Sequence, residues 1–292
     1  MGLPIQVIRL GVVGVVIGGV IAFKTIAANN AEEKIDLAIT NMGIPKDKIS
    51  YDVSVDLLGF ATHIEDIEMK ISEKESFKID EIVINDIDTE HQKPEYLNVE
   101  INGIHGDTKS LKMVDRSIAR VLDSMNKDEL ITNFALNYTF DKDAKVLNLK
   151  NLSLDVEDMG TLSLATKFHN VQSVENAVAS FNYAKLGNSS LTYEDSSLAN
   201  TLFAYNAKRS GQDLDQFKEN IIKDINKEIE KAETKEKDLE VKMLTAMADF
   251  VEDPESIEFS MDPEEPISVN RLSRRFNDET TLKTLNFDIS VN

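Results

Sequence analysis

Three stretches share one rhythm and decide the predicted fold: IEDIEMKI at residues 64–71, IDEIVIND at 79–86 and LNVEINGI at 97–104. In each stretch, the apolar residues are mostly separated by one or two acidic or amide-bearing residues. A spacing near two residues places successive side chains on opposite faces of a β-strand. The three stretches therefore predict an antiparallel meander with one apolar face and one acidic face.

The surrounding residues extend this meander and give it a cover. Strands are expected at residues 49–57, 67–71, 77–84 and 97–101. From Thr108 to Met125 the apolar spacing becomes helical, so this helix is expected to cover part of the apolar face. A second β block follows, with a hairpin formed by residues 147–156 and 161–168.

Beyond Val174 the pattern favours helices. A long helical region is expected at residues 213–251, interrupted where AETKEKD at 232–238 offers only one apolar residue. Its apolar spacing drifts from a heptad, so packing on the sheet is favoured over a coiled coil. The shorter expected elements are helices at 196–208, 268–276 and 279–285 and strands at 189–193, 257–261 and 287–291.

These patterns together predict an α+β fold. It consists of an N-terminal transmembrane helix, an antiparallel β-meander packed with amphipathic helices, and a mainly helical C-terminal part. The predicted domains are a membrane anchor at 1–28, a β-rich extracytoplasmic domain at 29–173 and a helical region packing on the sheet at 174–292.

The anchor is predicted from LGVVGVVIGGVIAF at residues 10–23, which carries no charge between Arg9 and Lys24. Extended to residues 5–28, it reaches the roughly 20 residues that span a bilayer. A cleaved signal peptide is the alternative, with a weak cleavage site at 25–27. The short basic amino tail favours a cytoplasmic N-terminus, and hence a single-pass protein with its body outside the cytoplasm.

Small residues lie on one face of this predicted membrane helix. Gly11, Gly14 and Gly18 have the spacing that lets two helices approach closely. They are the candidate packing residues for a helix partner in the membrane or for self-association. The alternative is that glycine is simply common in membrane helices.

Composition excludes several classes of function. The net charge of −20 at pH 7 argues against nucleic acid as a partner. The absence of cysteine excludes disulfides, thiol catalysis and cysteine-based metal sites. The hydrophobic content of 41% is sufficient for a folded core.

The residues that commonly carry chemistry form no recognisable motif. The four histidines, His63, His91, His105 and His169, lack the spacing of metal ligands, and His63 and His105 meet only if their strands pair. Residues 86–90 are similar to a calcium loop but lack its glycine and distal glutamate. The common nucleotide-binding, metalloprotease and hydrolase motifs are absent. We therefore expect no catalytic residues, no cofactor and no metal.

The layout resembles that of a known group of proteins. An amino-terminal anchor followed by repeated strands resembles bacterial inner-membrane-anchored periplasmic proteins of the AsmA-like kind. LTYEDSSLANTLFAYNAKRSG at 191–211, DFVEDPESIEFSMDPEEPISV at 249–269 and TLKTLNFDISVN at 281–292 resemble largely uncharacterised envelope proteins of proteobacteria. The resemblance implies a single-pass protein of the inner membrane with its body in the periplasm and a role in envelope or lipid homeostasis. It carries no catalytic residues.

Three functions are consistent with the sequence. The first is a non-enzymatic, membrane-anchored scaffold or interaction protein of the cell envelope. The alternative is a carrier or binder of lipid or another hydrophobic ligand, held on a sheet face that helices cover only in part. A hydrolase with an unrecognised site is the third.

Overall fold

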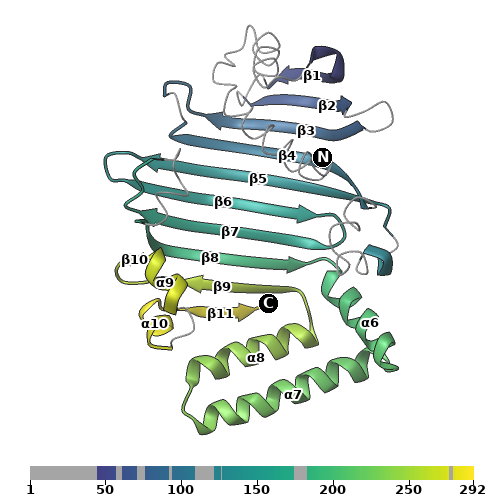
Figure 1. Cartoon of the computed structure of the whole chain (residues 1–292), viewed down its shortest axis with the longest axis vertical. Coiled ribbons are helices and arrows are strands. Elements are labelled where there is room, and N and C mark those ends of the chain that lie inside the picture. The colour runs from purple at the N-terminus through teal and green to yellow at the C-terminus, as the bar shows by residue number, and fades with distance from the viewer. Residues whose placement is uncertain are drawn as a thin grey trace, which may run out of the picture. The chain divides into compact units, whose positions relative to one another are not determined.

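The computed structural model of the chain describes residues 45–56, 61–70, 76–91, 94–108, 122–125, 127–173, 183–275 and 279–292. The chain divides into two compact units between Asp141 and Lys142. Figure 1 labels the helices and strands of both units.

Unit 1, which ends at Asp141, is an antiparallel meander in which each strand pairs with the next along the chain. Its elements are the 3-10 helix η1 (Lys46–Lys48) and strands β1 (Ile49–Val55), β2 (Thr62–Lys70), β3 (Ser76–Ile87), β4 (Tyr96–Asp107) and β5 (Glu129–Asp141). The predicted strands at the start of the chain are therefore present, and most are longer than expected.

The rhythm shared by the three stretches has a structural cause. Each has one step where two residues separate successive apolar residues: Glu65–Asp66, Asp80–Glu81 and Asn102–Gly103. The register places these three steps side by side in β2, β3 and β4. Asp66 and Gly103 lie in these steps and have positive φ angles of 50° and 65°. The extra residue in each strand keeps the apolar side chains on one face. On that face Ile79 and Ile101 are completely or almost completely buried.

Unit 2 also contains an antiparallel sheet, with strand order β6–β7–β8–β9–β11 and with β10 pairing with β8. Its strands are β6 (Val146–Val156), β7 (Gly160–His169), β8 (Lys185–Asp195), β9 (Ser256–Met261), β10 (Ile267–Ser268) and β11 (Asp288–Val291). Its helices are α6 (Leu198–Ser210), α7 (Leu214–Thr234), α8 (Asp238–Glu252), α9 (Val269–Arg275) and α10 (Glu279–Thr284).

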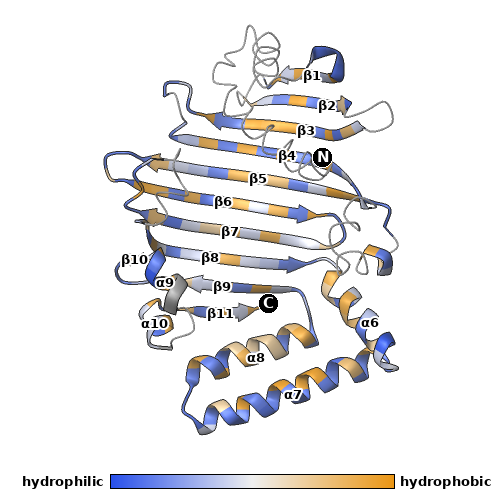
Figure 2. Cartoon of the chain, viewed as in Figure 1, coloured by the Kyte–Doolittle hydropathy of each residue, from blue (hydrophilic) through white to orange (hydrophobic). Residues whose placement is uncertain are grey.

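Helices α7 and α8 form an antiparallel hairpin (Figure 1). The Asp213 side chain accepts a hydrogen bond from the backbone N–H of Gln216 and so caps the start of α7. Apolar and polar residues alternate along α7, as Figure 2 shows by colour, and this amphipathic pattern is typical of a helix that buries one face. The helical conformation is interrupted between α7 and α8, where Glu236 has a φ of 53°, and this interruption lies within the one expected at 232–238.

The predicted fold class is wrong about the C-terminal part. The C-terminal part does not consist mainly of helices packed on a sheet that earlier residues form. It supplies β8, β9, β10 and β11, which are strands of the unit 2 sheet. Strand β8 was underestimated because a register irregularity near Gly187 and Asn188 interrupts the alternation of its side chains. In addition, no helix among the described residues is long and apolar enough to span a membrane.

Several expectations concern residues outside the described part of the chain. These are the apolar stretch 10–23, with the packing residues Gly11, Gly14 and Gly18, and most of the helix expected at 108–125. Of that helix, Thr108 and residues 122–125 are described, and Leu122 is buried.

Candidate functional site

Two rows of leucine side chains cross the unit 2 sheet. The register aligns Leu152 with Leu164 and Leu191 in one row, and Leu154 with Leu162 in the next. Since residues two apart in a strand point to the same side, both rows lie on one face. The exposed fractions are 45% for Leu154, 44% for Leu162 and 38% for Leu191. We call this set of five residues the leucine ladder.

Helix α8 covers the continuation of the same rows but not the ladder. The rows run on from β8 into β9, where Leu191 pairs with Phe259 and Tyr193 pairs with Ile257. There Ile257 packs with Ala246 of α8 in a buried apolar cluster that Phe259 and Tyr193 adjoin. One face of the sheet is therefore covered at β9 and left partly open at β6 and β7.

Polar groups mark the two ends of the leucine ladder. At one end, the next row contains Leu149, Thr166 and Ser189, and the hydroxyls of Thr166 and Ser189 share a hydrogen bond of 2.7 Å. At the other end, the Tyr193 hydroxyl donates to the Asp195 carboxylate over 2.6 Å. Polar groups thus limit the apolar surface along β7 and β8, whereas Leu149 continues it on β6.

The network around Tyr193 is structural. Burial, followed by the hydrogen bond to Asp195, raises the pKa of Tyr193 well above its ordinary value, so the phenol stays a neutral donor. The Asp195 carboxylate also accepts from the backbone N–H of Ala199 over 2.9 Å, at the start of α6. Gly160 has a φ of 147°, and a Cβ there would lie 2.4 Å from the carbonyl oxygen of Glu194. The network therefore fixes the β6–β7 turn against β8 and α6.

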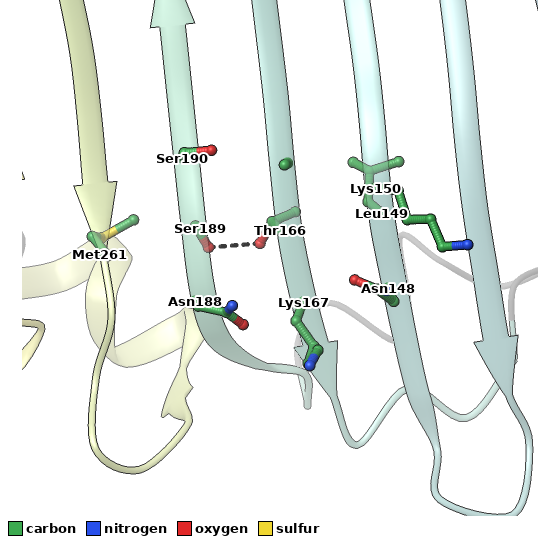
Figure 3. A pocket seen from close by; sticks show the side chains of 10 residues that line it. Asn148, Leu149, Lys150, Thr166, Lys167, Asn188, Ser189, Ser190 and Met261 are labelled. Carbon is green, nitrogen blue, oxygen red and sulfur yellow. Dashed lines mark hydrogen bonds between the residues drawn. The ribbon is translucent and has the colours of Figure 1, made fainter.

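A shallow cavity of about 390 Å³ lies on the unit 2 sheet (Figure 3). Strands β6, β7, β8 and β9 supply its lining, which combines polar and apolar surface. The lining residues are Asn148, Leu149, Lys150, Ala165, Thr166, Lys167, Asn188, Ser189, Ser190 and Met261.

The histidines of unit 1 each bind carboxylates and do not form one site. His63 Nδ1 lies 2.7 Å from Glu81. The two ring nitrogens of His105 lie 3.1 Å from Asp80 and 3.1 Å from Glu129. His63 lies in β2 and His105 in β4, and each of these strands pairs with β3, so the two histidines have different partners and do not meet.

Asp88, in the stretch similar to a calcium loop, holds a turn. Its carboxylate, only 2% exposed, accepts backbone N–H groups of Glu90, His91 and Glu95 and contacts the His91 ring over 2.9 Å. Burial alone would raise the pKa of Asp88, but these hydrogen bonds outweigh it and lower the pKa to about 2. Within the described part of the chain, no group of three acidic or histidine side chains could hold a metal ion.

Sequence reasoning did not identify the leucine ladder as a site. A signal was present, because TLSLATKF at 161–168 alternates leucine with small polar residues. Such alternation predicts a strand with one apolar face, but it does not reveal whether a helix covers that face.

The comparisons with known proteins concern unit 2. A family model described as "Uncharacterized protein" matches residues 153–292, a range that contains most of the leucine ladder. A search of the curated proteins finds no match. Neither finding tests the resemblance to AsmA-like proteins, which stays a prediction.

Proposed function

We propose that the protein is a non-enzymatic component of the cell envelope that binds a hydrophobic ligand, such as a lipid acyl chain, on the leucine ladder. The observation that carries this proposal is the alignment of half-exposed leucines in two adjacent rows. Single exposed leucines are common on protein surfaces and need no explanation, whereas contiguous apolar surface is typical of binding sites.

The dimensions of the ladder suit an extended hydrocarbon chain. Rows two residues apart along a strand are separated by roughly 7 Å, and neighbouring strands by roughly 5 Å. The row of Leu152, Leu164 and Leu191 therefore extends about 10 Å across three strands, and the row of Leu154 and Leu162 runs beside it across two. A hydrocarbon chain lying along these rows would contact leucine methyl groups of both. Each methylene removed from water in this way contributes about 0.8 kcal/mol to binding.

The proposed location follows from the sequence alone. The anchor predicted at residues 10–23, together with the resemblance to periplasmic envelope proteins, favours the inner membrane with the body in the periplasm, and those residues lie outside the described part of the chain. Attachment to a membrane would keep the ladder close to a source of lipid, which is consistent with the proposed ligand.

Extraction of lipid from the purified full-length protein tests the proposal. We expect the wild-type protein to carry lipid that mass spectrometry identifies, and Leu162→Asp to carry much less. Because Leu162 is 44% exposed, this change should leave the melting temperature almost unaltered. Met247→Asp, at a position on α8 that is 49% exposed, is the matched control and should keep its lipid. Absence of lipid from the wild-type protein, or equal amounts in both variants, would contradict the proposal.

The scaffold function is a second candidate, favoured by a groove in the α7–α8 hairpin. This groove, of about 530 Å³, is lined by the apolar residues Ile221, Ile225 and Leu244 and is rimmed by charged side chains. Met247 lies one turn beyond Leu244, with its side chain half exposed. Such a groove can accept the apolar side chains of a partner helix. If the scaffold function holds, Met247→Asp should abolish a cross-linked protein partner that Leu162→Asp retains.

A further inference from the structure

We propose that the shallow cavity on strands β6, β7 and β8 is a binding site for a phosphate-bearing anion, held by Lys150 and Lys167. This site is independent of the proposed hydrophobic ligand, and it would give unit 2 a second, charged ligand.

The register brings the polar lining of the cavity together. Asn148 of β6 lies directly opposite Lys167 of β7, and Lys150 is two residues further along β6. Lys150 lies in the register irregularity of β6 between Leu149 and Leu152. In Figure 3 the side chains of Lys150 and Lys167 leave their strands in different directions, so both amines reach one anion only after the flexible Lys150 side chain changes rotamer. The amide of Asn188 and the hydroxyl of Ser190 line the same cavity and add neutral donors (Figure 3).

The two lysines of this cavity carry positive charge on an acidic protein. The protein has a net charge of −20, yet neither Lys150 nor Lys167 forms an ion pair with any residue among those described. By contrast, other lysines of unit 2, such as Lys227 and Lys231, pair with acidic residues of their own helix. The two lysines of the cavity therefore keep their positive charge available for a ligand.

The positive charges near the cavity also affect the pKa of a neighbouring histidine, His169. His169 lies in β7 opposite Lys185 and two residues from Lys167. Burial lowers the pKa of His169, and the charges of Lys167 and Lys185 lower it further. A site that disfavours a third positive charge in this way favours an anion.

Phosphate matches the chemistry of the donors. Lysine binds phosphate as a compact point charge with three donors, and amide and hydroxyl groups complete the coordination of its oxygens. The cavity is open and shallow, so it suits the exposed end of a larger molecule as well as a free ion. The phosphate therefore has two sources to be distinguished, a small soluble phosphate and the headgroup of a phospholipid.

Titration of the full-length protein tests the site with three probes: inorganic phosphate, glycerol 3-phosphate and phosphatidylglycerol vesicles. We expect saturable binding of at least one probe, measured by calorimetry for the soluble probes and by co-sedimentation for the vesicles. Loss of one charged hydrogen-bond donor should weaken affinity about tenfold, so this is the effect expected of Lys167→Gln and of Lys150→Gln. Lys208→Gln, at an exposed position on α6, is the control and should bind as the wild type does.

Each outcome decides between support and contradiction. Binding of a soluble phosphate that Lys167→Gln weakens supports the site with a soluble ligand. Binding of vesicles alone, weakened by the same change, supports it with a lipid headgroup. The absence of binding by all three probes would overturn the proposal, and so would binding that Lys150→Gln and Lys167→Gln leave unchanged while circular dichroism shows both variants folded. Because the leucine ladder is unaltered in both variants, extraction of bound acyl lipid should proceed as in the wild type.

Discussion

Replacement of Asp88 by asparagine should destabilise unit 1 and change its response to acid. The carboxylate accepts three backbone N–H groups and contacts the His91 ring, with distances of 2.8 to 3.2 Å. Asparagine keeps the shape of the side chain but offers one oxygen in place of two. Its amide nitrogen would then face a donor, either the N–H of Glu95 or those of Glu90 and His91.

The size of the effect follows from the pKa. The fall of the Asp88 pKa from its ordinary value of 3.8 to about 2 corresponds to about 2.5 kcal/mol, because one pKa unit is worth about 1.4 kcal/mol. A carboxyl group with a lowered pKa stabilises the fold fully above its unfolded pKa. This contribution is therefore present above about pH 4 and is lost as the pH falls towards about 2.

Urea unfolding of the full-length protein, followed by circular dichroism at pH 6, 4 and 2.5, measures both effects. At pH 6, Asp88→Asn should lower the free energy of unfolding of unit 1 by about 2.5 kcal/mol. The variant should also lack the part of the decline in unfolding free energy between pH 4 and 2 that protonation of Asp88 causes. The matched control is Asp143→Asn, an exposed position in the β5–β6 turn, where the change should stay within about 0.5 kcal/mol. If Asp88→Asn behaves like this control, the hydrogen bonds assigned to the carboxylate do not stabilise the fold.

Three further predictions test other parts of the chain. Gly160→Ala should destabilise unit 2 by about 2 kcal/mol or more, since φ is 147° and the new Cβ would clash with a backbone oxygen. Gly211→Ala, where φ is 69° and no atom lies near the new Cβ, should cost only about 1 kcal/mol. Equal losses of stability in thermal melts of the two variants would refute this. Tyr138→Phe should cost about 1 kcal/mol at pH 7 by removing the hydrogen bond to the Pro94 carbonyl. Because burial raises the pKa of Tyr138 to about 12, the wild type but not this variant should lose stability between pH 10 and 12 in alkaline unfolding curves. Membrane fractionation should find the full chain with membranes and a chain that begins at residue 29 in the soluble fraction; recovery of both in one fraction would contradict attachment through residues 1–28.

The local alternation of side chains was sufficient to predict the unit 1 meander. The two polar residues between Ile64 and Ile67 break a strict period of two, but the same break occurs in the next two strands, and the register aligns all three. A repeated irregularity of this kind is visible in sequence as a shared rhythm. The sequence does not show that the breaks lie side by side, because that depends on strand pairing.

The errors in unit 2 have two physical causes. In β8, two residues, Gly187 and Asn188, lie opposite the single residue Lys167, and this irregularity hid the true length of the strand. The leucine ladder was missed because its exposure depends on the position of α8, which covers Ile257 and leaves Leu162 partly open. Exposure of this kind results from tertiary packing between residues almost a hundred positions apart, and alternation within one strand carries no information about it.

Site-specific labelling tests the central claim, that the leucine ladder binds a hydrophobic chain, most directly. The protein contains no cysteine, so Leu162→Cys introduces a single site for an environment-sensitive fluorophore. Met247→Cys on α8 gives a label of similar exposure away from the ladder. On titration with oleate, we predict a saturable blue shift of the label at residue 162 and no shift at residue 247. A label at residue 162 that does not respond, or equal responses at both positions, would contradict binding at the ladder.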